Sequence, residues 1–513
     1  YKPQFYTTLS YFQDGWKGSH DFKMGYDWKR DRRSLFRDQP FDIFYRDTNG
    51  VTAQVDLYNT PVTGINDVVY NAAYINDTWK LNDRLTLNLG VRFEAYTDGW
   101  QDQEFTPNGI PALAGFTDQR YLDFIAPRTV EARTVASTKT FVPRLGLAYN
   151  LTGDNRTVLK VFAGQSRWNS ADTLADLENP VGRAQLRYAF LPCTATRTTQ
   201  CDLNGNRLVD SPAELGAFNS TQGGGGFVRI DRDIERPTSN EVSVNLEREI
   251  SNSFSGRASY VYKNMRNVWG EIDAIRTPAY TIPYTLVDPG PDNNLATTAD
   301  NQTFQTFDRP ATIGTDRLYT NSDFRDADFQ TVELGVNRRF SGKWMMLSSV
   351  GYTWSTMLHD TTGYGRLTSA AAYRPARRLF GDENGMETST TWNYKVIGRY
   401  TMPWDIGFSG SWKVQSGQQY GRTISVAFPG DSTQTVRVEP IDAHRYPTVA
   451  IMDVRADKSF SMGRAGKMTF QFDVFNLTNS GVPTDLRLTS VNFNEVLTIL
   501  SPRVMRVGFR YDF

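Results

Sequence analysis

The sequence predicts an all-β fold, a transmembrane antiparallel β-barrel to which this chain contributes about 15 strands. Three observations predict it. Apolar and polar residues alternate, the alternating segments run for about 10–14 residues, and short and long connections alternate along the chain. A soluble β-sandwich also alternates, but strands of globular proteins average about 5–6 residues, whereas a tilted membrane strand needs about 9–11.

The alternation is clearest near residue 90. One face carries Leu85, Leu87, Leu89, Val91, Phe93 and Ala95, and the other carries Thr86, Asn88, Gly90, Arg92, Glu94 and Tyr96. The last segment repeats the pattern, with Met505, Val507, Phe509, Tyr511 and Phe513 on one face. We expect lipid on the apolar side of each strand and a polar filling such as water on the other side.

The same pattern places each element in order. We predict strands near 3–13, 20–32, 69–81, 84–97, 139–151, 156–168, 239–250, 253–267, 326–340, 343–357, 391–402, 405–416, 448–461, 467–478 and 502–513. Tight turns fill 14–19, 82–83, 152–155, 251–252, 341–342, 403–404 and 462–466. Long loops, expected outside the cell, fill 33–68, 98–138, 169–238, 268–325, 358–390, 417–447 and 479–501.

Composition excludes two other classes of protein. The chain has 56 basic and 56 acidic residues, and this zero net charge argues against a nucleic-acid partner. No apolar run approaches the roughly 20 residues of a membrane helix. Aromatic residues reach 13%, which suits a barrel with aromatic girdles.

The strand count predicts missing N-terminal parts. Single-chain bacterial barrels have even strand numbers, and the first strand precedes a short turn, so it runs toward the periplasm. Tyr1-Lys2-Pro3 has the character of internal sequence. We therefore expect a fragment that begins inside a barrel and that is unstable alone, because an open sheet edge cannot persist in lipid. The C-terminal Phe513, which ends an amphipathic strand, is typical of outer-membrane barrels.

Several motifs resemble those of TonB-dependent receptors, in particular the Oar-like branch. They are the hairpin Asn76-Asp77-Thr78-Trp79-Lys80 to Arg92, Pro143 to Tyr149, Arg236-Pro237-Thr238-Ser239-Asn240-Glu241, Phe472 to Asn479, and the ending Pro502 to Phe513. Their order and spacing cover about residues 69–513.

The resemblance implies a 22-stranded barrel, in which these would be strands 8 to 22, with an N-terminal plug domain and a TonB box that are not in this chain. It implies import of a bulky ligand, energised through the TonB-ExbB-ExbD complex, in the outer membrane of a Gram-negative bacterium. It does not identify the ligand. A passive porin or a structural outer-membrane protein is the alternative, with an internal constriction loop in place of a plug.

The loop 169–238 contains a predicted disulfide and a calcium candidate. Cys193 and Cys201 are the two cysteines, and their closeness predicts one local disulfide, with two free thiols as the alternative. Oxygen-bearing side chains at Asp202, Asn204, Asn206 and Asp210 resemble the start of a Ca²⁺ loop. Counted from Asp202, a Ca²⁺ loop has its glycine at the sixth position and its glutamate at the twelfth. Here Gly205 is at the fourth position and Glu214 is one residue late. A polar turn is therefore the alternative. We expect no other cofactor.

Inward-facing charges and outward-facing aromatics complete the interpretation. Cross-strand ion pairs are favoured over a ligand path for Asp453, Arg455, Asp457, Asp473, Arg506, Arg510 and Asp512. Girdles at the lipid headgroups are favoured over sugar stacking for Tyr260, Tyr262, Trp344, Tyr352, Trp354, Trp412 and Tyr511.

A catalytic role has little support. The three histidines, His20, His359 and His444, have no partner at catalytic or metal spacing, and hydrolase and metalloprotease motifs are absent. A histidine-dependent barrel enzyme stays open as a third hypothesis, because triads assemble across strands.

Overall fold

One antiparallel sheet of 15 strands, here called the wall, dominates the molecule. The structure is a computed structural model, and it describes residues 2–168, 172–224, 228–322, 326–358, 386–431 and 433–513. Each strand pairs with its neighbours in chain order. The strands are β1 (Gln4–Asp14), β2 (Ser19–Arg37), β5 (Val62–Lys80), β6 (Leu85–Trp100), β9 (Arg133–Asn150), β10 (Thr157–Arg167), β14 (Thr238–Ser251), β15 (Phe254–Arg266), β20 (Ala327–Ser341), β21 (Trp344–Leu358), β22 (Met386–Thr401), β23 (Ile406–Gln415), β28 (Val449–Ser461), β29 (Lys467–Phe475) and β32 (Val504–Asp512).

The predicted strands and their order are confirmed. At the short turns, strand ends agree with the prediction within one residue. Toward the long connections some strands run further than predicted, since β2 continues to Arg37 and β5 begins at Val62, whereas β29 ends three residues early at Phe475. Backbone pairing does not stop where the apolar pattern stops, because two strands that leave the lipid side by side keep their ladder hydrogen bonds.

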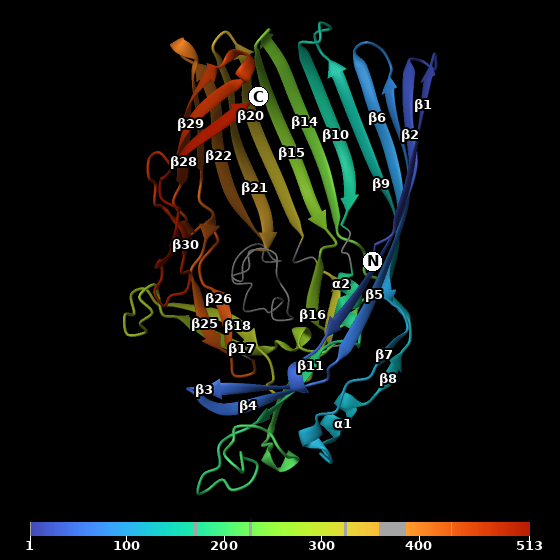
Figure 1. The fold of residues 1–513 in the computed structure, drawn as a ribbon, viewed down its shortest axis with the longest axis vertical. Helices are drawn as coiled ribbons and strands as arrows, with labels where there is room; N and C mark the ends of the chain where they lie inside the picture. The colour runs from blue at the N-terminus through green and yellow to red at the C-terminus, as the bar shows by residue number, and fades with distance from the viewer. Residues whose placement is uncertain (1, 169–171, 225–227, 323–325, 359–385, 432) are drawn as a thin grey trace.

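The sheet is a curved wall, with the short turns at one end and the long connections at the other (Figure 1). β1 and β32 lie at its two edges and do not pair with each other. The large antiparallel sheet is therefore shown. Closure into a barrel and a total of 22 strands stay predictions.

The two faces of the wall differ as the alternation predicts. One row crosses eight strands through residues that are all apolar or aromatic: Leu87, Leu147, Val161, Val244, Tyr260, Val332, Tyr352 and Trp392. Val244 is 37% exposed although apolar, while its polar neighbour Ser243 is only 8% exposed. Phe509, also predicted to face lipid, is 61% exposed. Exposed apolar rows beside less exposed polar ones are the reverse of a soluble core, so the outward face fits lipid.

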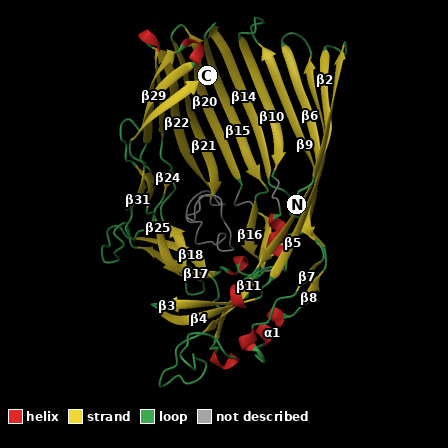
Figure 2. Cartoon of the chain, viewed as in Figure 1, coloured by secondary structure: helices red, strands yellow, loops and turns green. Residues whose placement is uncertain are grey.

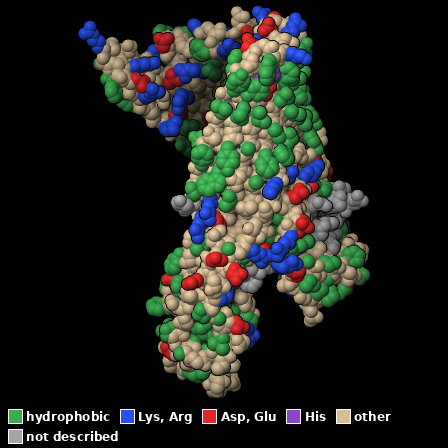
Figure 3. Space-filling model, turned by 90° about the vertical axis from the view of Figure 1, so that its right-hand side faces the viewer, with side chains coloured by type: hydrophobic (Ala, Val, Ile, Leu, Met, Phe, Trp, Pro, Cys, Tyr) green, Lys and Arg blue, Asp and Glu red, His purple; other side chains and the backbone are tan. Residues whose placement is uncertain are grey.

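Aromatic residues mark two levels on this outward face. Trp344, Tyr400 and Phe408 face one another near the short turns, and Trp354 lies ten residues further along β21. At about 3.3 Å per residue and a tilt of about 40°, ten residues span roughly 25 Å, the height of a barrel's apolar band. Figure 3 shows hydrophobic side chains gathered on the upper wall, with charged groups above and below them.

The long connections contain strands of their own, which the sequence did not predict. These are β3 (Ile43–Thr48), β4 (Val51–Tyr58), β7 (Gln103–Phe105), β8 (Arg128–Val130), β11 (Ala184–Ala189), β12 (Phe218–Gly223), β13 (Val228–Ile230), β16 (Trp269–Asp273), β17 (Ile282–Asp288), β18 (Gln302–Asp308), β19 (Arg317–Asn321), β24 (Gln419–Tyr420), β25 (Thr423–Ala427), β26 (Thr433–Arg437), β27 (His444–Arg445), β30 (Pro483–Leu486) and β31 (Val496–Ile499). Two short α-helices, α1 (Gln119–Ile125) and α2 (Thr173–Glu178), also lie there (Figure 2).

Parts of these connections pack into several bodies below the wall, two of which are named the first and the second loop body (Figure 1). The first loop body joins the β3–β4 and β11–β12 strands with α1, around a core of Val55, Leu57, Ile110, Leu113, Tyr121, Leu186, Tyr188, Phe190, Val209 and Leu215. The second loop body joins the hairpins β17–β18 and β25–β26, around Leu286, Ile424, Phe428, Val436 and Val438. Each core draws its side chains from more than one connection, so neighbouring connections share a core.

No helix within the described ranges is both long enough and apolar enough to span a membrane.

Adjacent positions on β29 test which face meets lipid. Phe472→Arg places a charge on the outward face and should destabilise the protein in lipid vesicles by about 2–4 kcal/mol. Gln471→Arg faces Asp457 on the inward side and should change stability little. Urea unfolding in vesicles measures both variants, and equal costs would contradict the assignment of the faces.

Candidate functional site

The inward face of the wall carries a polar hollow near the short turns. Glu247, Arg257, Gly335, Ser349 and Lys395 form one row across five strands. Because Gly335 has no side chain, the row dips at its centre. The hollow around it measures about 490 Å³ and also includes Glu249, Ser255 and Asn337.

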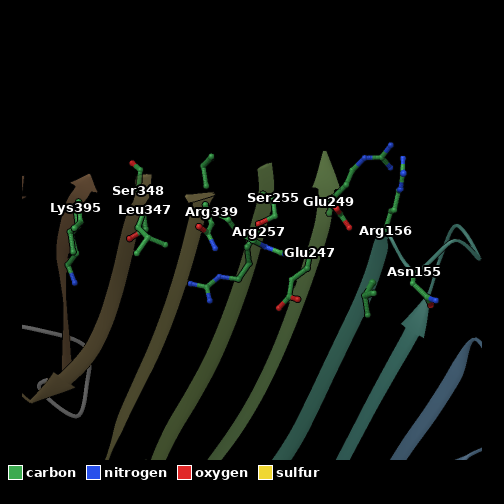
Figure 4. Close-up of a pocket in the computed structure, with 18 residues that line it drawn as sticks. Asn155, Arg156, Glu247, Glu249, Ser255, Arg257, Arg339, Leu347, Ser348 and Lys395 are labelled. Atoms are coloured by element: carbon green, nitrogen blue, oxygen red, sulfur yellow. The ribbon is translucent and has the colours of Figure 1, made fainter. Parts of the chain in front are cut away.

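The hollow carries more positive than negative charge. Figure 4 shows its side chains rising from neighbouring strands close to the strand ends. Glu247 forms an ion pair with Lys160 at 2.7 Å, and Arg257 forms one with Glu333. Apart from Arg248, whose position on β14 alternates to the outward face, the lining contains four basic residues, Arg156, Arg257, Arg339 and Lys395, and two acidic ones, Glu247 and Glu249. Such a surface can exchange ion pairs with a polar domain placed in the lumen.

The inward charges near the C-terminus pair as predicted. Asp473 accepts hydrogen bonds from Arg455 on one side, at 2.6 Å, and from Arg506 on the other, at 2.9 Å. On the neighbouring strands Arg399 binds Asp457 with two hydrogen bonds, of 2.6 and 2.8 Å.

The remaining members of this predicted set also have partners. Asp453 accepts a hydrogen bond from the backbone N–H of Asn476 at 2.9 Å, and Arg510 pairs with Asp512 on its own strand at 2.7 Å. These contacts satisfy polar groups of the inward face, but neither is the cross-strand ion pair that the sequence predicted for Asp453, Arg510 and Asp512.

Part of the predicted loop 169–238 lies against the inner wall. Arg236, 1% exposed, donates to Glu94 of β6 at 2.6 Å and to Thr140 of β9 at 2.8 Å. The backbone N–H of Leu174, in α2, donates to Asp98 of β6 at 3.2 Å. Glu94 and Asp98 belong to the inward face of β6, so this segment narrows the end of the lumen next to the loop bodies.

A buried arginine holds three connections together. Arg422 is 2% exposed, and it donates to both oxygens of Asp288 at 2.6 Å, to Glu439 at 3.0 Å and to Ser490 at 2.7 Å. Burial alone would lower the pKa of Arg422, but the hydrogen bonds to Asp288 and Glu439 raise that pKa above its ordinary value. The guanidinium therefore stays charged and links the connections that follow β15, β23 and β29.

Two more buried ion pairs support the second loop body. Arg309 pairs with Asp431 at 3.0 Å, and Arg437 pairs with Glu387 at the start of β22. Sequence reasoning missed these pairs because their members lie 122 and 50 positions apart. No local motif carries this information.

The predicted disulfide is present between Cys193 and Cys201, with Cα atoms 5.0 Å apart. It closes a short segment of the first loop body's long connection, just before the calcium candidate.

The structure brings the predicted calcium residues together. Asp202 accepts backbone N–H groups of Gly205 and Arg207 at 2.8 Å, while Asn204 and Asn206 both donate to Asp210. Glu214, one residue late in the sequence pattern, folds back and accepts the N–H of Leu203 and of Asp210.

Hydrogen bonds within the segment therefore already satisfy its carboxylates. Across the described part of the chain, no group of three or more His, Cys, Asp and Glu side chains is arranged to hold a metal ion. Calcium binding stays a prediction.

The two histidines within the described residues, His20 and His444, lie apart. His20 pairs with Asp77 at 2.7 Å near a short turn, and His444 pairs with Glu439 at 2.8 Å in the second loop body. His359 lies outside the described residues. His20 and His444 therefore do not share a site.

Comparison with known proteins agrees with this architecture. Residues 4–415 match the family model described as an outer membrane beta barrel domain. The chain is 22% identical over 509 residues to a curated protein named TonB-dependent transporter Oar, from Myxococcus xanthus, a match over 86% of this chain and 42% of that protein.

Solved structures share the fold. The outer membrane transporter YddB from Escherichia coli aligns with 99% of this chain and 53% of its own, at 12% identity and a TM-score of 0.55. The ferric-catecholate import receptor Fiu from the same species aligns with 99% and 54%, at 10% identity and a TM-score of 0.50. The chain thus spans about half the length of these relatives or less, and none of their names is that of an enzyme.

Removal of the acid that faces Arg422 tests the link between connections. Asp288→Ala leaves a buried guanidinium with Glu439 as its remaining acid, and we expect a loss of about 3 kcal/mol in the stability of the second loop body. Hydrogen–deuterium exchange of β17 and β25 should rise. Asp316→Ala, which removes the half-buried partner of the exposed Arg229, is the matched control and should leave exchange unchanged.

Calcium binding is tested by protection of the loop from protease. If Asp202 and Asp210 hold Ca²⁺, adding the ion should slow cleavage within 202–214 several-fold, and Asp210→Asn should abolish the effect. Asp123→Asn, in α1, serves as the control. Equal cleavage rates with Ca²⁺ and with a chelator would refute the prediction.

Proposed function

The chain belongs to the outer membrane beta-barrel domain family and lies in the outer membrane of a Gram-negative bacterium; from that premise we propose that it forms the membrane wall of a TonB-dependent transporter that imports a bulky ligand. The observation that carries the proposal is the polar, ion-paired inner wall of a chain that matches a named TonB-dependent transporter over 86% of its length. A wall of this kind suits a lumen filled by a polar domain and not by lipid.

In the proposed complete protein, further strands close the sheet. β1 and β32 each have one edge without a neighbouring strand. An unpaired edge is costly in lipid, since each unsatisfied backbone group loses a hydrogen bond there. A barrel of 22 strands, with those beyond the present set inserted between β32 and β1, removes both edges.

The proposed plug domain occupies the lumen and rests on the inward hollow. The basic excess around Arg339 and Lys395 favours an acidic surface on the plug, while the Lys160–Glu247 pair offers both signs of charge. A TonB box outside this chain would then transmit energy from the TonB-ExbB-ExbD complex to the plug.

The two loop bodies are proposed to capture the ligand outside the cell. Their cores and the Arg422 link make them rigid enough to present a fixed surface.

The second candidate function is a passive porin, and one observation favours it. The segment that contains α2 and Arg236 lies against the inner wall, as a constriction loop does. A porin would conduct ions continuously, whereas a plugged transporter would not.

Conductance separates these functions. We expect the protein purified at its natural length from outer membranes to show no steady conductance in a planar bilayer with KCl, because a plug blocks the lumen. We also expect it to bind the periplasmic domain of TonB in a pull-down. Steady KCl conductance without TonB binding would establish the porin and reject the transporter.

A further inference from the structure

Two lysines face each other on the inward side of the wall. Lys395 of β22 and Lys413 of β23 are direct cross-strand partners, and both residues are exposed. Like charges directly opposite each other destabilise a sheet, because the Cβ atoms of such partners lie only about 4.5–5.5 Å apart. The continuous ladder fixes the register, so the two side chains cannot move apart by a slip of one strand past the other.

The surroundings of this pair do not balance its charge. The adjacent inward positions are all uncharged, and they are Ser349, Asn393, Ile397, Ser411, Gln415 and Ile451. Asp453 lies diagonally from Lys413. Its carboxylate accepts hydrogen bonds from the backbone N–H of Asn476 at 2.9 Å and from the hydroxyl of Ser411 at 3.4 Å. Within the described part of the chain neither lysine forms an ion pair, and a positive charge remains even when Asp453 is counted.

Other cations on the same inward face have an acid of the wall beside them. Arg399, also on β22, binds Asp457 with two hydrogen bonds. Lys160 pairs with Glu247 at 2.7 Å. Because the wall neutralises these cations by itself, the two uncompensated lysines indicate a negative charge that comes from outside the wall.

The pair is open to the lumen and has further hydrogen-bond donors next to it. Lys395 lies at one edge of the polar hollow (Figure 4), whereas Lys413 lies one strand beyond its lining. Ser349, the partner of Lys395 on β21, adds a hydroxyl. A Cβ atom at Gly351 would lie 3.1 Å from the amide nitrogen of Asn393, so this amide lies over the glycine and beside the lysines. An anion can therefore reach two ammonium groups, a hydroxyl and an amide from the lumen.

We propose that four inward side chains, which we name the lysine site, bind a phosphate-type oxyanion from the lumen: Lys395, Lys413, Ser349 and Asn393. Their N–H and O–H groups donate hydrogen bonds to its oxygens, and its negative charge offsets the repulsion between the two lysines. The site itself rests only on the inward face of the wall. That the oxyanion is carried by the imported ligand rests on the proposed function.

The geometry of the anion distinguishes the lysine site from a general attraction between charges. A phosphate group carries about −1.5 to −2 charges at pH 7 and three strong acceptor oxygens. A carboxylate has a single charge and two oxygens, and chloride has a single charge without directed acceptors. We therefore expect the lysine site to prefer phosphate to acetate, and acetate to chloride.

Chemical labelling of lysines in the protein at its natural length tests the proposal. Reductive methylation in detergent is followed at each lysine by peptide mass spectrometry, in phosphate, glycerol phosphate, acetate or chloride of equal ionic strength. We expect phosphate and glycerol phosphate to slow the labelling of Lys395 and Lys413 several-fold relative to chloride, because a bound anion shields both amino groups. Lys160, which already has an acid partner on the same face, should be labelled at the same rate in all four salts.

Three variants make the labelling decisive. Lys413→Gln removes one of the two charges and should abolish the protection of Lys395, whereas Lys413→Arg keeps the charge and should retain the protection. Lys467→Gln, which removes an inward lysine that faces Asp512 on β32, is the matched control and should leave the protection unchanged.

Four outcomes contradict the proposal. Equal labelling of Lys395 in phosphate and chloride, or protection that persists in Lys413→Gln, shows that no anion is held between the lysines. Lysines that are already unreactive in chloride show that another part of the protein, such as a plug carboxylate, covers them. Protection by phosphate but not by glycerol phosphate rejects a ligand-borne group. A failure of TonB binding, by contrast, leaves the lysine site intact.

Discussion

The structure depends on one constraint: in lipid, every backbone N–H and C=O must find a partner within the protein. The antiparallel ladder meets this requirement across fifteen strands in chain order. Continuous pairing in turn fixes the register, and the register places Leu87, Val244 and Tyr352 in one outward row. In the proposed transporter, the same constraint places the further strands at the two unpaired edges, β1 and β32.

An apolar outward face requires charged groups to lie elsewhere, and they are found in two environments. On the inward face they pair across strands, as Asp473 does with Arg455 and Arg506. These pairs are partly solvated, so each adds little to stability, but together they create a wall that water or a polar domain can wet. In the loop bodies the pairs are buried, and there the loss of one member is costly.

Buried pairs explain how long connections become rigid. Arg422 holds segments that follow three different strands, and the small apolar cores around Leu57 and Leu286 bury what no single connection could bury. The His20–Asp77 pair is the exception to this distribution, because it lies on the outward face beside Trp79. Its position next to a short turn, where lipid headgroups begin, is the least costly place for such a pair.

The sequence by itself determined the wall, and tertiary structure decided the loops. Alternation and turn chemistry are local, so strand order, strand faces and the strand ends at short turns could be predicted, as could the Cys193–Cys201 disulfide between near neighbours. The inward ion pairs followed from the alternation once neighbouring strands were known to pair. By contrast, Asp288 and Arg422 lie 134 positions apart, and Arg309 and Asp431 lie 122 apart. No period in the sequence relates such residues, because their contact depends on how independent connections fold against one another in space.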